Sequence, residues 1–176
     1  MKKSLSLLLV CALLVFAMPC ALADGTTTLT TTVPASATYT LNIPADQAIA
    51  YGATRTDIGS LTVSNSSGFA VGKHLDVTVT YGDFTSEDVD TTIPMILMGI
   101  PTKTGVQDYS LDSGSTIRFH GQSNGSVGST PSRVSGTSSY SFNSMYISIN
   151  STDWGKALGG DYTNTITFSA KVVVTE

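Results

Sequence analysis

Apolar and polar residues alternate along most of the chain after residue 36. In the clearest stretch, 75–81, Leu75, Val77, Val79 and Tyr81 fall on one side and the residues between them on the other. Strict alternation is typical of a β-strand with one buried face and one wet face. The same pattern predicts further strands at 39–43, 58–63, 95–100, 106–111, 116–119, 145–149 and 166–174.

Turn-forming residues separate these segments, for example Pro44 and the glycine-containing stretches 81–83, 112–114 and 159–161. Eight or nine short strands at this spacing predict two packed antiparallel sheets. We therefore expect an all-β protein, a single β-sandwich (immunoglobulin-like or fimbrial-subunit-like) of about seven to nine antiparallel strands.

Only residues 151–158 have a helical pattern. Ser151 is a candidate N-cap for a single turn that would carry Trp154 and Leu158 inward. Gly155 disfavours a longer helix.

Two other segments depart from the alternating pattern. Residues 121–139 are rich in Ser and Gly, with only Val127 and Val134 as branched apolar residues, and this composition predicts a long exposed loop. Residues 26–33 are rich in Thr, with Leu29 and Val33 on one side, and they predict a strand or extension within residues 24–35.

The first residues are typical of a secretory signal peptide. Lys2 and Lys3 precede an apolar run at 5–16, and the small residues Ala21 and Ala23 suit cleavage after Ala23. The run is too short to cross a bilayer, which takes about 20 apolar residues. We therefore predict a signal peptide at 1–23, a Thr-rich extension at 24–35 and a β-sandwich domain at 36–176, in a protein that is secreted or held at the cell surface.

Cleavage at that point changes both the cysteine count and the charge. Cys11 and Cys20 are the only cysteines, so the mature chain would have no disulfide and no thiolate metal site. Nine basic residues less Lys2 and Lys3 leave seven against thirteen acidic ones, a net charge of −6. An acidic domain whose few Lys and Arg residues are scattered repels phosphate backbones, so we expect no nucleic-acid partner. No second apolar stretch reaches transmembrane length.

One stretch matches a catalytic motif. Residues 121–125 read Gly-Gln-Ser-Asn-Gly, the G-x-S-x-G pattern in which Ser123 would be the nucleophile. That motif works where a strand turns sharply into a helix, and here a Ser/Gly-rich segment follows. In a chain this rich in Ser and Gly we interpret the match as coincidence, and we predict no enzyme and no catalytic residues.

Metal-binding residues are few. The acidic cluster of residues 83–90 (Asp83, Glu87, Asp88 and Asp90) could offer oxygen ligands to calcium, but its spacing fits no EF-hand loop, and a solvated loop is the favoured interpretation. His74 and His120 are the only histidines and lie on different segments. We therefore predict no metal site and no cofactor.

Three aromatic residues, Trp154, Tyr146 and Tyr140, could form a platform on which sugar rings stack. The favoured interpretation places Trp154 in the core, beneath the last strand. Its exposure would separate the two possibilities.

The segment 160–168, Gly-Asp-Tyr-Thr-Asn-Thr-Ile-Thr-Phe, resembles the closing strand of bacterial fimbrial-type and spore-coat-U-like subunits. It is also similar to closing strands of small exported β-sandwich proteins of Gram-positive gut bacteria, and residues 51–63 resemble sequence of the same group of proteins. The resemblance implies a β-sandwich at a bacterial surface. Two features depart from it: such subunits commonly carry a disulfide, and 26–33 offers mainly Leu29 and Val33 to fill a neighbour's groove.

Together these patterns predict a non-enzymatic secreted or cell-surface structural or adhesin-like protein. It would act through protein–protein contacts or assembly, with other subunits or a surface ligand such as a glycan as partners. The alternative is a secreted carbohydrate-binding module. A third hypothesis, a small hydrolase, rests on Ser123 alone.

Overall fold

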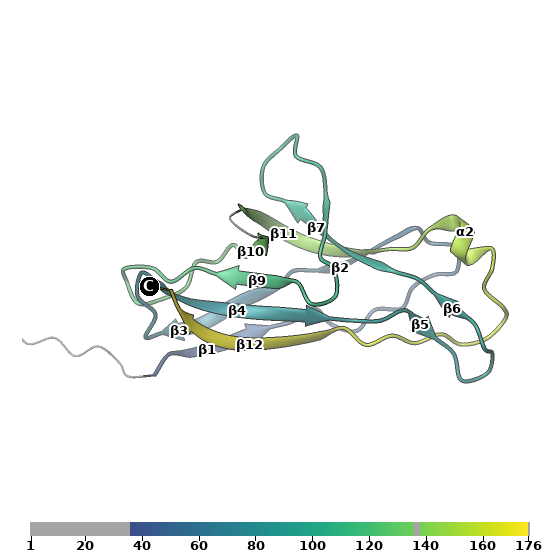
Figure 1. Cartoon of the computed structure of the whole chain (residues 1–176), viewed down its shortest axis with the longest axis horizontal. Coiled ribbons are helices and arrows are strands. Elements are labelled where there is room, and N and C mark those ends of the chain that lie inside the picture. Colours follow the sequence, from purple (N-terminus) through teal and green to yellow (C-terminus); the bar gives the residue numbers. More distant parts are fainter. Residues whose placement is uncertain (1–35, 136–137, 176) are drawn as a thin grey trace, which may run out of the picture. The chain divides into compact units, whose positions relative to one another are not determined.

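The computed structural model describes residues 36–135 and 138–175, and nearly all of their regular structure is β (Figure 1). One short helix, α2 (Ser151–Trp154), accompanies the strands. The strands are β1 (Thr38–Asn42), β2 (Arg55–Gly59), β3 (Thr62–Ser67), β4 (Lys73–Thr80), β5 (Phe84–Thr85), β6 (Thr92–Ile93), β7 (Ile96–Pro101), β8 (Tyr109–Ser110), β9 (Thr116–Phe119), β10 (Ser132–Ser135), β11 (Ser138–Ser148) and β12 (Thr167–Val174). The predicted all-β class is confirmed, and the predicted signal peptide and Thr-rich extension lie outside the described residues.

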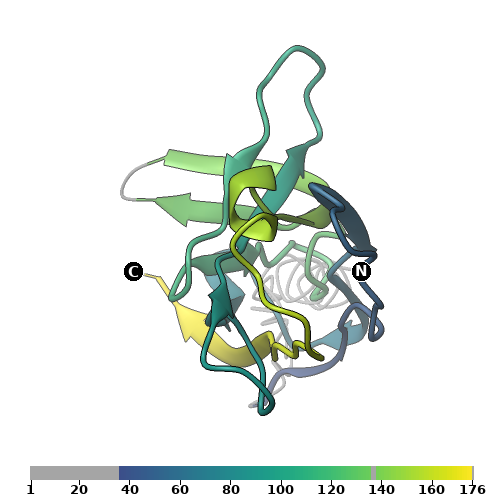
Figure 2. The ribbon, with the colours of Figure 1, turned by 90° about the vertical axis from the view of Figure 1, so that its right-hand side faces the viewer.

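All strand pairs are antiparallel, and most strands belong to one large sheet in the order β12-β4-β9-β10-β11-β7-β8, with β2 also paired to β11. β1 pairs with β3, and β5 with β6, in two smaller sheets. Viewed almost along the strands, the sheets surround a common interior, as expected of a β-sandwich (Figure 2).

The longest strand, β11, connects the two halves of the large sheet. Its first residues, Ser138–Ser141, pair with β10, whereas Met145–Ser148 pair with β2 on one edge and with β7 on the other. The register shifts near residues 142–146 on both partners. A single strand of eleven residues thereby holds both parts of the sheet together.

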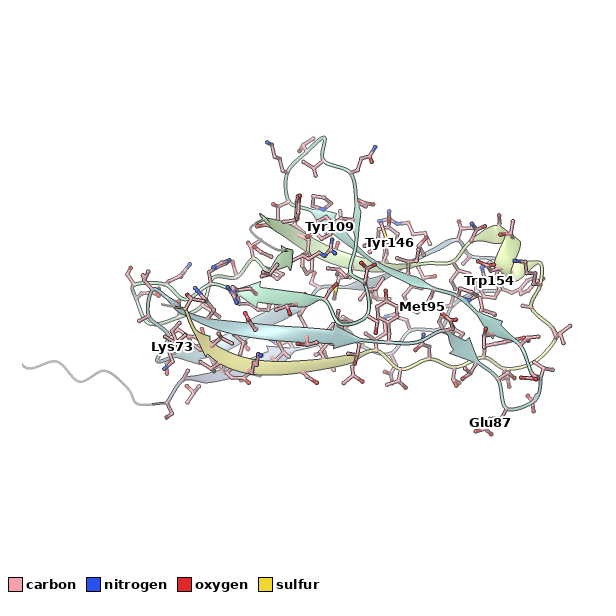
Figure 3. The ribbon with its side chains drawn as sticks, viewed as in Figure 1. Lys73, Glu87, Met95, Tyr109, Tyr146 and Trp154 are labelled. Carbon is pink, nitrogen blue, oxygen red and sulfur yellow. The ribbon has the colours of Figure 1, made fainter. Side chains whose placement is uncertain are left out.

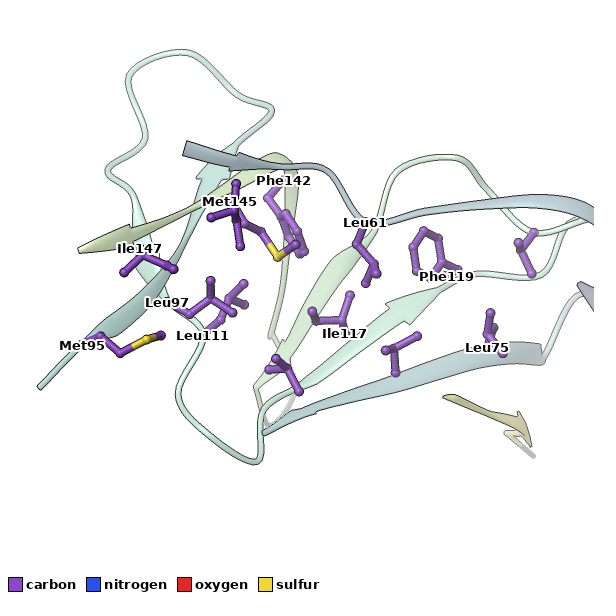
Figure 4. Close-up of a cluster of buried hydrophobic side chains, with 14 of the residues drawn as sticks. Leu61, Leu75, Met95, Leu97, Leu111, Ile117, Phe119, Phe142, Met145 and Ile147 are labelled. Atoms are coloured by element: carbon purple, nitrogen blue, oxygen red, sulfur yellow. The ribbon is translucent and has the colours of Figure 1, made fainter. Parts of the chain in front are cut away.

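The core fills the interior between the sheets. Apolar side chains from β4, β7, β9 and β11 meet there with Leu61, which lies in the link between β2 and β3 (Figure 4). Tyr39, Leu41 and Val63, on β1 and β3, pack against this cluster from the second sheet. Full burial of each such side chain contributes roughly 1.5–3 kcal/mol, so this cluster is the main source of stability.

The structure divides one predicted strand. The prediction of a single strand at 58–63 is wrong, because β2 ends at Gly59, whose φ of 99° lies in the left-handed region. The break lets the chain change sheets: β2 pairs with β11, and β3 pairs with β1. Ile58 and Leu61 remain buried on either side of it.

The prediction of a strand at 106–111 holds only for β8, two residues long. Residues 102–108 form a loop, in which the Val106 amide donates to the Lys103 carbonyl across a turn and Gly105 has a φ of 80°. Short pairings of this kind explain why the described residues contain twelve strands, where about seven to nine were predicted.

The prediction of a long exposed loop at 121–139 is wrong. The segment contains β10, which is paired on both edges, to β9 and to β11. Val127 and Ser132 are buried, and the Ser132 hydroxyl lies 3.0 Å from that of Ser141 across the strands. Ser132 can be buried in β10 because strand pairing satisfies its backbone groups and its hydroxyl has a hydrogen-bond partner.

The predicted helical turn is present but begins one residue earlier. Asn150, not Ser151, is the N-cap: its side-chain oxygen accepts from the Thr152 amide, and Gly155 follows the last helical residue. Asparagine is a strong N-cap because its short side chain reaches the free amides of the first turn.

Candidate functional site

One long edge of the large sheet is formed by β12. This strand of eight residues pairs only with β4 among the described strands, from Thr167 opposite Thr80 to Val174 opposite Lys73. Val172 is 38% and Val174 69% exposed, and Lys171 is the one charged residue in the strand. A strand edge with unpaired backbone N–H and C=O groups is a template for pairing with another chain.

A second edge belongs to β1, whose only partner among the described strands is β3. Tyr39 and Leu41 on β1 and Phe168 and Ala170 on β12 pack against the core yet stay only partly buried. Both strands run along the lower side of the domain in Figure 1. The inward faces of both edge strands therefore leave apolar surface incompletely covered.

A pocket of about 630 Å³ lies where α2 meets the loops at one end of the strands. Aromatic and aliphatic side chains make up most of its wall, and Gln47, Asp161, Thr163 and Asn164 add polar groups. Ligand pockets commonly combine an apolar lining of this kind with a few polar groups.

Trp154 is fixed in the pocket wall by its polar end. Its indole N–H donates to the Ala53 carbonyl oxygen at 2.9 Å, and its ring meets Tyr51 edge-on, with centroids 5.5 Å apart. Tyr51 is 82% exposed. Trp154 packs on the core, as expected, but it is only partly buried, and it contributes to the pocket as well.

The three aromatics suggested as a sugar platform do not come together. Figure 3 shows Trp154, the last residue of α2, at one end of the domain. Tyr109, whose ring lies 5.6 Å from that of Tyr140, belongs to another part of the domain. Tyr146 is buried beneath Arg55, whose guanidinium lies 3.8 Å from the ring centroid, and its hydroxyl donates to Asp108. Neither Tyr140 nor Tyr146 lines the pocket.

Ser123 occupies a hairpin turn. Gly121 bridges to Val127, and the Gln122 amide donates to the Ser126 carbonyl, so that 122–126 form a turn with Ser123 exposed. The strand-to-helix elbow that the G-x-S-x-G motif requires is therefore not formed at these residues.

The first glycine of this motif has a structural role. A β-carbon on Gly121 would overlap the carbonyl oxygens of Ala70 and Lys73, because the two backbones pass close together. Glycine is needed wherever backbones approach this closely. Close packing therefore explains the first glycine of the G-x-S-x-G match, Gly121, without any catalytic role.

The sequence placed the two histidines on different segments, but the sheet brings them together. The register that sets Leu75 opposite Phe119 also sets His74 beside His120, and their ring centroids are 5.0 Å apart. His74 Nδ1 accepts from the Gly121 amide at 3.3 Å, and Nε2 lies 3.0 Å from the Thr175 hydroxyl. Burial, then the charges of Arg118 and His120, lower the pKa of His74 below 6.5.

The acidic residues 83–90 lie around the β5–β6 hairpin at the same end of the domain as Trp154, where Figure 3 labels Glu87. Among the described residues, no three histidine, aspartate or glutamate side chains come close enough to hold a metal ion.

Tyr51 is the functional candidate that the sequence did not indicate. It follows a segment without regular structure and lies about a hundred positions before its neighbour Trp154, so neither periodicity nor spacing connects them. The only available signal was a large aromatic residue beside Gly52, a turn position with a φ of 78°.

Comparisons with protein-family models, with curated proteins and with solved structures gave no match. Within the described residues, no helix is long and apolar enough to cross a membrane.

Proposed function

We propose that this protein is a non-enzymatic, exported subunit that acts at a cell surface by assembling with other proteins. The observation that carries the proposal is the second edge of β12, which pairs with no other strand among the described residues and bears the exposed Val172 and Val174. An added strand on this edge would satisfy backbone donors and acceptors by main-chain pairing, which is a common mode of protein recognition.

The partly buried side chains beside this edge favour the same conclusion. Phe168 on β12 and Leu41 on β1 already touch the core, so an extended segment placed against either edge strand would bury them further. Removing apolar surface from water is worth about 25 cal/mol per Å² and adds to the backbone pairing. We propose the Thr-rich sequence 26–33 of a neighbouring copy as the incoming strand.

Light scattering coupled to size-exclusion chromatography tests the proposal. A chain that begins at Asp24 is expected to form oligomers, whereas one that begins at Ala35 should stay monomeric because it lacks the incoming strand. If both are stable monomers, the N-terminal segment does not join subunits.

A second experiment addresses the accepting edge. Val172→Lys together with Val174→Lys places two charges on β12, and we expect the oligomers of the longer chain to dissociate, since charged residues block edge pairing. Ile96→Lys is the matched control, because Ile96 is 49% exposed on β7, away from this edge. Equal dissociation by the control would mean that added charge, rather than the edge, is responsible.

A further inference from the structure

We infer that the pocket between α2 and the 159–164 loop binds an uncharged pyranose, the terminal sugar of a neutral glycan. The inference rests on the proposed function, because it gives the surface protein its ligand. Its geometry is nevertheless separate from the strand edge, since neither Val172 nor Val174 lines the pocket.

Two aromatic residues of the pocket, Trp154 and Tyr162, have their polar atoms bonded within the protein. Trp154 donates its indole N–H to Ala53, and the Tyr162 hydroxyl donates to the Leu158 carbonyl at 3.0 Å while it also contacts the Thr91 hydroxyl. With their polar ends occupied, these rings offer electron-rich faces and apolar edges. The C–H groups on one side of a pyranose ring suit such a surface.

Tyr51 is the residue that most needs an explanation. Its ring is 82% exposed although it already contacts Trp154 edge-on, at an interplanar angle of 67°. Leu158 nearby is 56% exposed, so the rim of the pocket is apolar on two sides. A sugar ring that stacks on Tyr51 would cover an aromatic surface that the fold itself leaves in water.

Polar groups at the pocket match the hydroxyls of a sugar better than a purely apolar ligand. Gln47 and Asp161 are exposed in the wall, and the Asn164 amide is oriented by its donation to the Gly82 carbonyl at 2.7 Å. A hydrocarbon ligand that displaced water from Gln47 and Asp161 would give these two side chains no hydrogen-bond partner in its place, which costs affinity.

The charge near the pocket favours a neutral ligand. Asp161 is in the wall, and Asp88 packs against Gly160 from behind, with its Cβ 3.7 Å from the position of a β-carbon there. The nearby cation, Lys156, pairs with Asp153 at 3.3 Å. This negative field repels carboxylates and phosphates, so uronic acids, sialic acids and fatty acids fit poorly.

Trp154 is the only tryptophan in the chain, so its fluorescence reports on the pocket directly. We would titrate the purified protein with methyl hexopyranosides and with neutral gluco-, xylo- and N-acetylglucosamine oligosaccharides. Glucuronic and sialic acids serve as charged comparisons. We expect a saturable change in emission with at least one neutral sugar and none with the acids.

Two tyrosine variants test the assignment to this pocket. Tyr51→Ala should weaken binding about tenfold, equivalent to ~1.4 kcal/mol. Tyr140→Ala is the matched control, because Tyr140 is 46% exposed but does not line the pocket, and it should bind as the wild type does. The inference is overturned if no neutral sugar saturates the signal, if the acids bind as tightly, or if Tyr51→Ala binds normally. A wild-type protein that binds a neutral sugar but stays monomeric would count against the proposed assembly alone.

Discussion

His74 joins three parts of the chain through its two ring nitrogens. Nδ1 accepts from the Gly121 amide, and Nε2 contacts the Thr175 hydroxyl, which itself donates to the Gly72 carbonyl. This arrangement requires a neutral ring, because a proton on Nδ1 would face the proton of the Gly121 amide. A single residue thus links the end of β12 to the turn after β9 only while it is uncharged.

The lowered pKa of His74 predicts acid sensitivity. The unfolded chain, with a histidine pKa near 6.5, binds more protons than the folded chain between 6.5 and the folded value. Stability should therefore fall as the pH decreases through 6.5 and continue to fall until the folded pKa is passed. Thermal midpoints measured between about pH 4 and 8, compared with those of His74→Gln, would isolate this contribution.

His120→Gln is the matched control for that measurement. It should keep most of the pH dependence, because burial is the largest cause of the His74 shift and the His120 charge a smaller one. If wild type and His74→Gln lose stability in parallel below pH 6.5, His74 is not the sensitive group.

At the scale of elements, β4 and β9 are joined by a buried ion pair. Asp76 lies opposite Arg118 in the register, and two hydrogen bonds of 2.7 Å connect the guanidinium to the carboxylate. The Asp76 side chain is only 6% exposed. Alternation predicted this face of β4 to be wet, and the prediction is wrong at Asp76 because a charged side chain can be buried when a neighbouring strand supplies its counter-ion.

Removing one partner should destabilise the sheet strongly. Arg118→Met leaves the Asp76 carboxylate buried and unpaired, and we expect about 3 kcal/mol or more of lost stability by urea denaturation. The double variant Asp76→Leu with Arg118→Met should lie within about 1 kcal/mol of the wild type, since an apolar pair removes both desolvation costs. A double variant as unstable as the single one would show that the loss comes from packing rather than from the unpaired charge.

The elements that the sequence predicted well are those in which the apolar pattern and the sheet register agree. Thr116–Phe119 matches the predicted strand, and β4 and β12 match within two residues, because each alternates large apolar side chains toward the core. β10 was missed because Ser132 is buried through hydrogen bonding and strand pairing, which hydropathy does not register. Alternation can be recognised within a short stretch of sequence, whereas the pairing of distant segments cannot.

For the whole molecule the same reasoning explains which sites could be foreseen. Trp154 was identified as a candidate because it is a conspicuous aromatic residue, but its assumed partners Tyr140 and Tyr146 were wrong. The neighbour it has, Tyr51, becomes visible only once the segments before β2 and after β11 meet at one end of the strands. The proximity of His74 and His120 likewise depends on the pairing of β4 with β9.

The two proposed surfaces lie in different parts of the domain, and this predicts that they act independently. β12 ends at the marked C-terminus, whereas α2 lies toward the opposite end of the strands in Figure 1. Trp154 of α2 lines the pocket. Substitutions without shared partners usually have additive effects. The β12 variant Val172→Lys with Val174→Lys should therefore lose assembly and bind the neutral sugar with unchanged affinity, while Tyr51→Ala should assemble normally.

Light scattering and tryptophan fluorescence on the same two proteins measure both properties. A subunit built this way could join its neighbours along β12 and still present every pocket to solvent. If assembly instead abolished the sugar-dependent fluorescence change of the wild type, the pocket would lie within the subunit contact, and the two surfaces would compete. Independence of the two readouts is thus the property that a ligand-binding, assembling surface subunit requires.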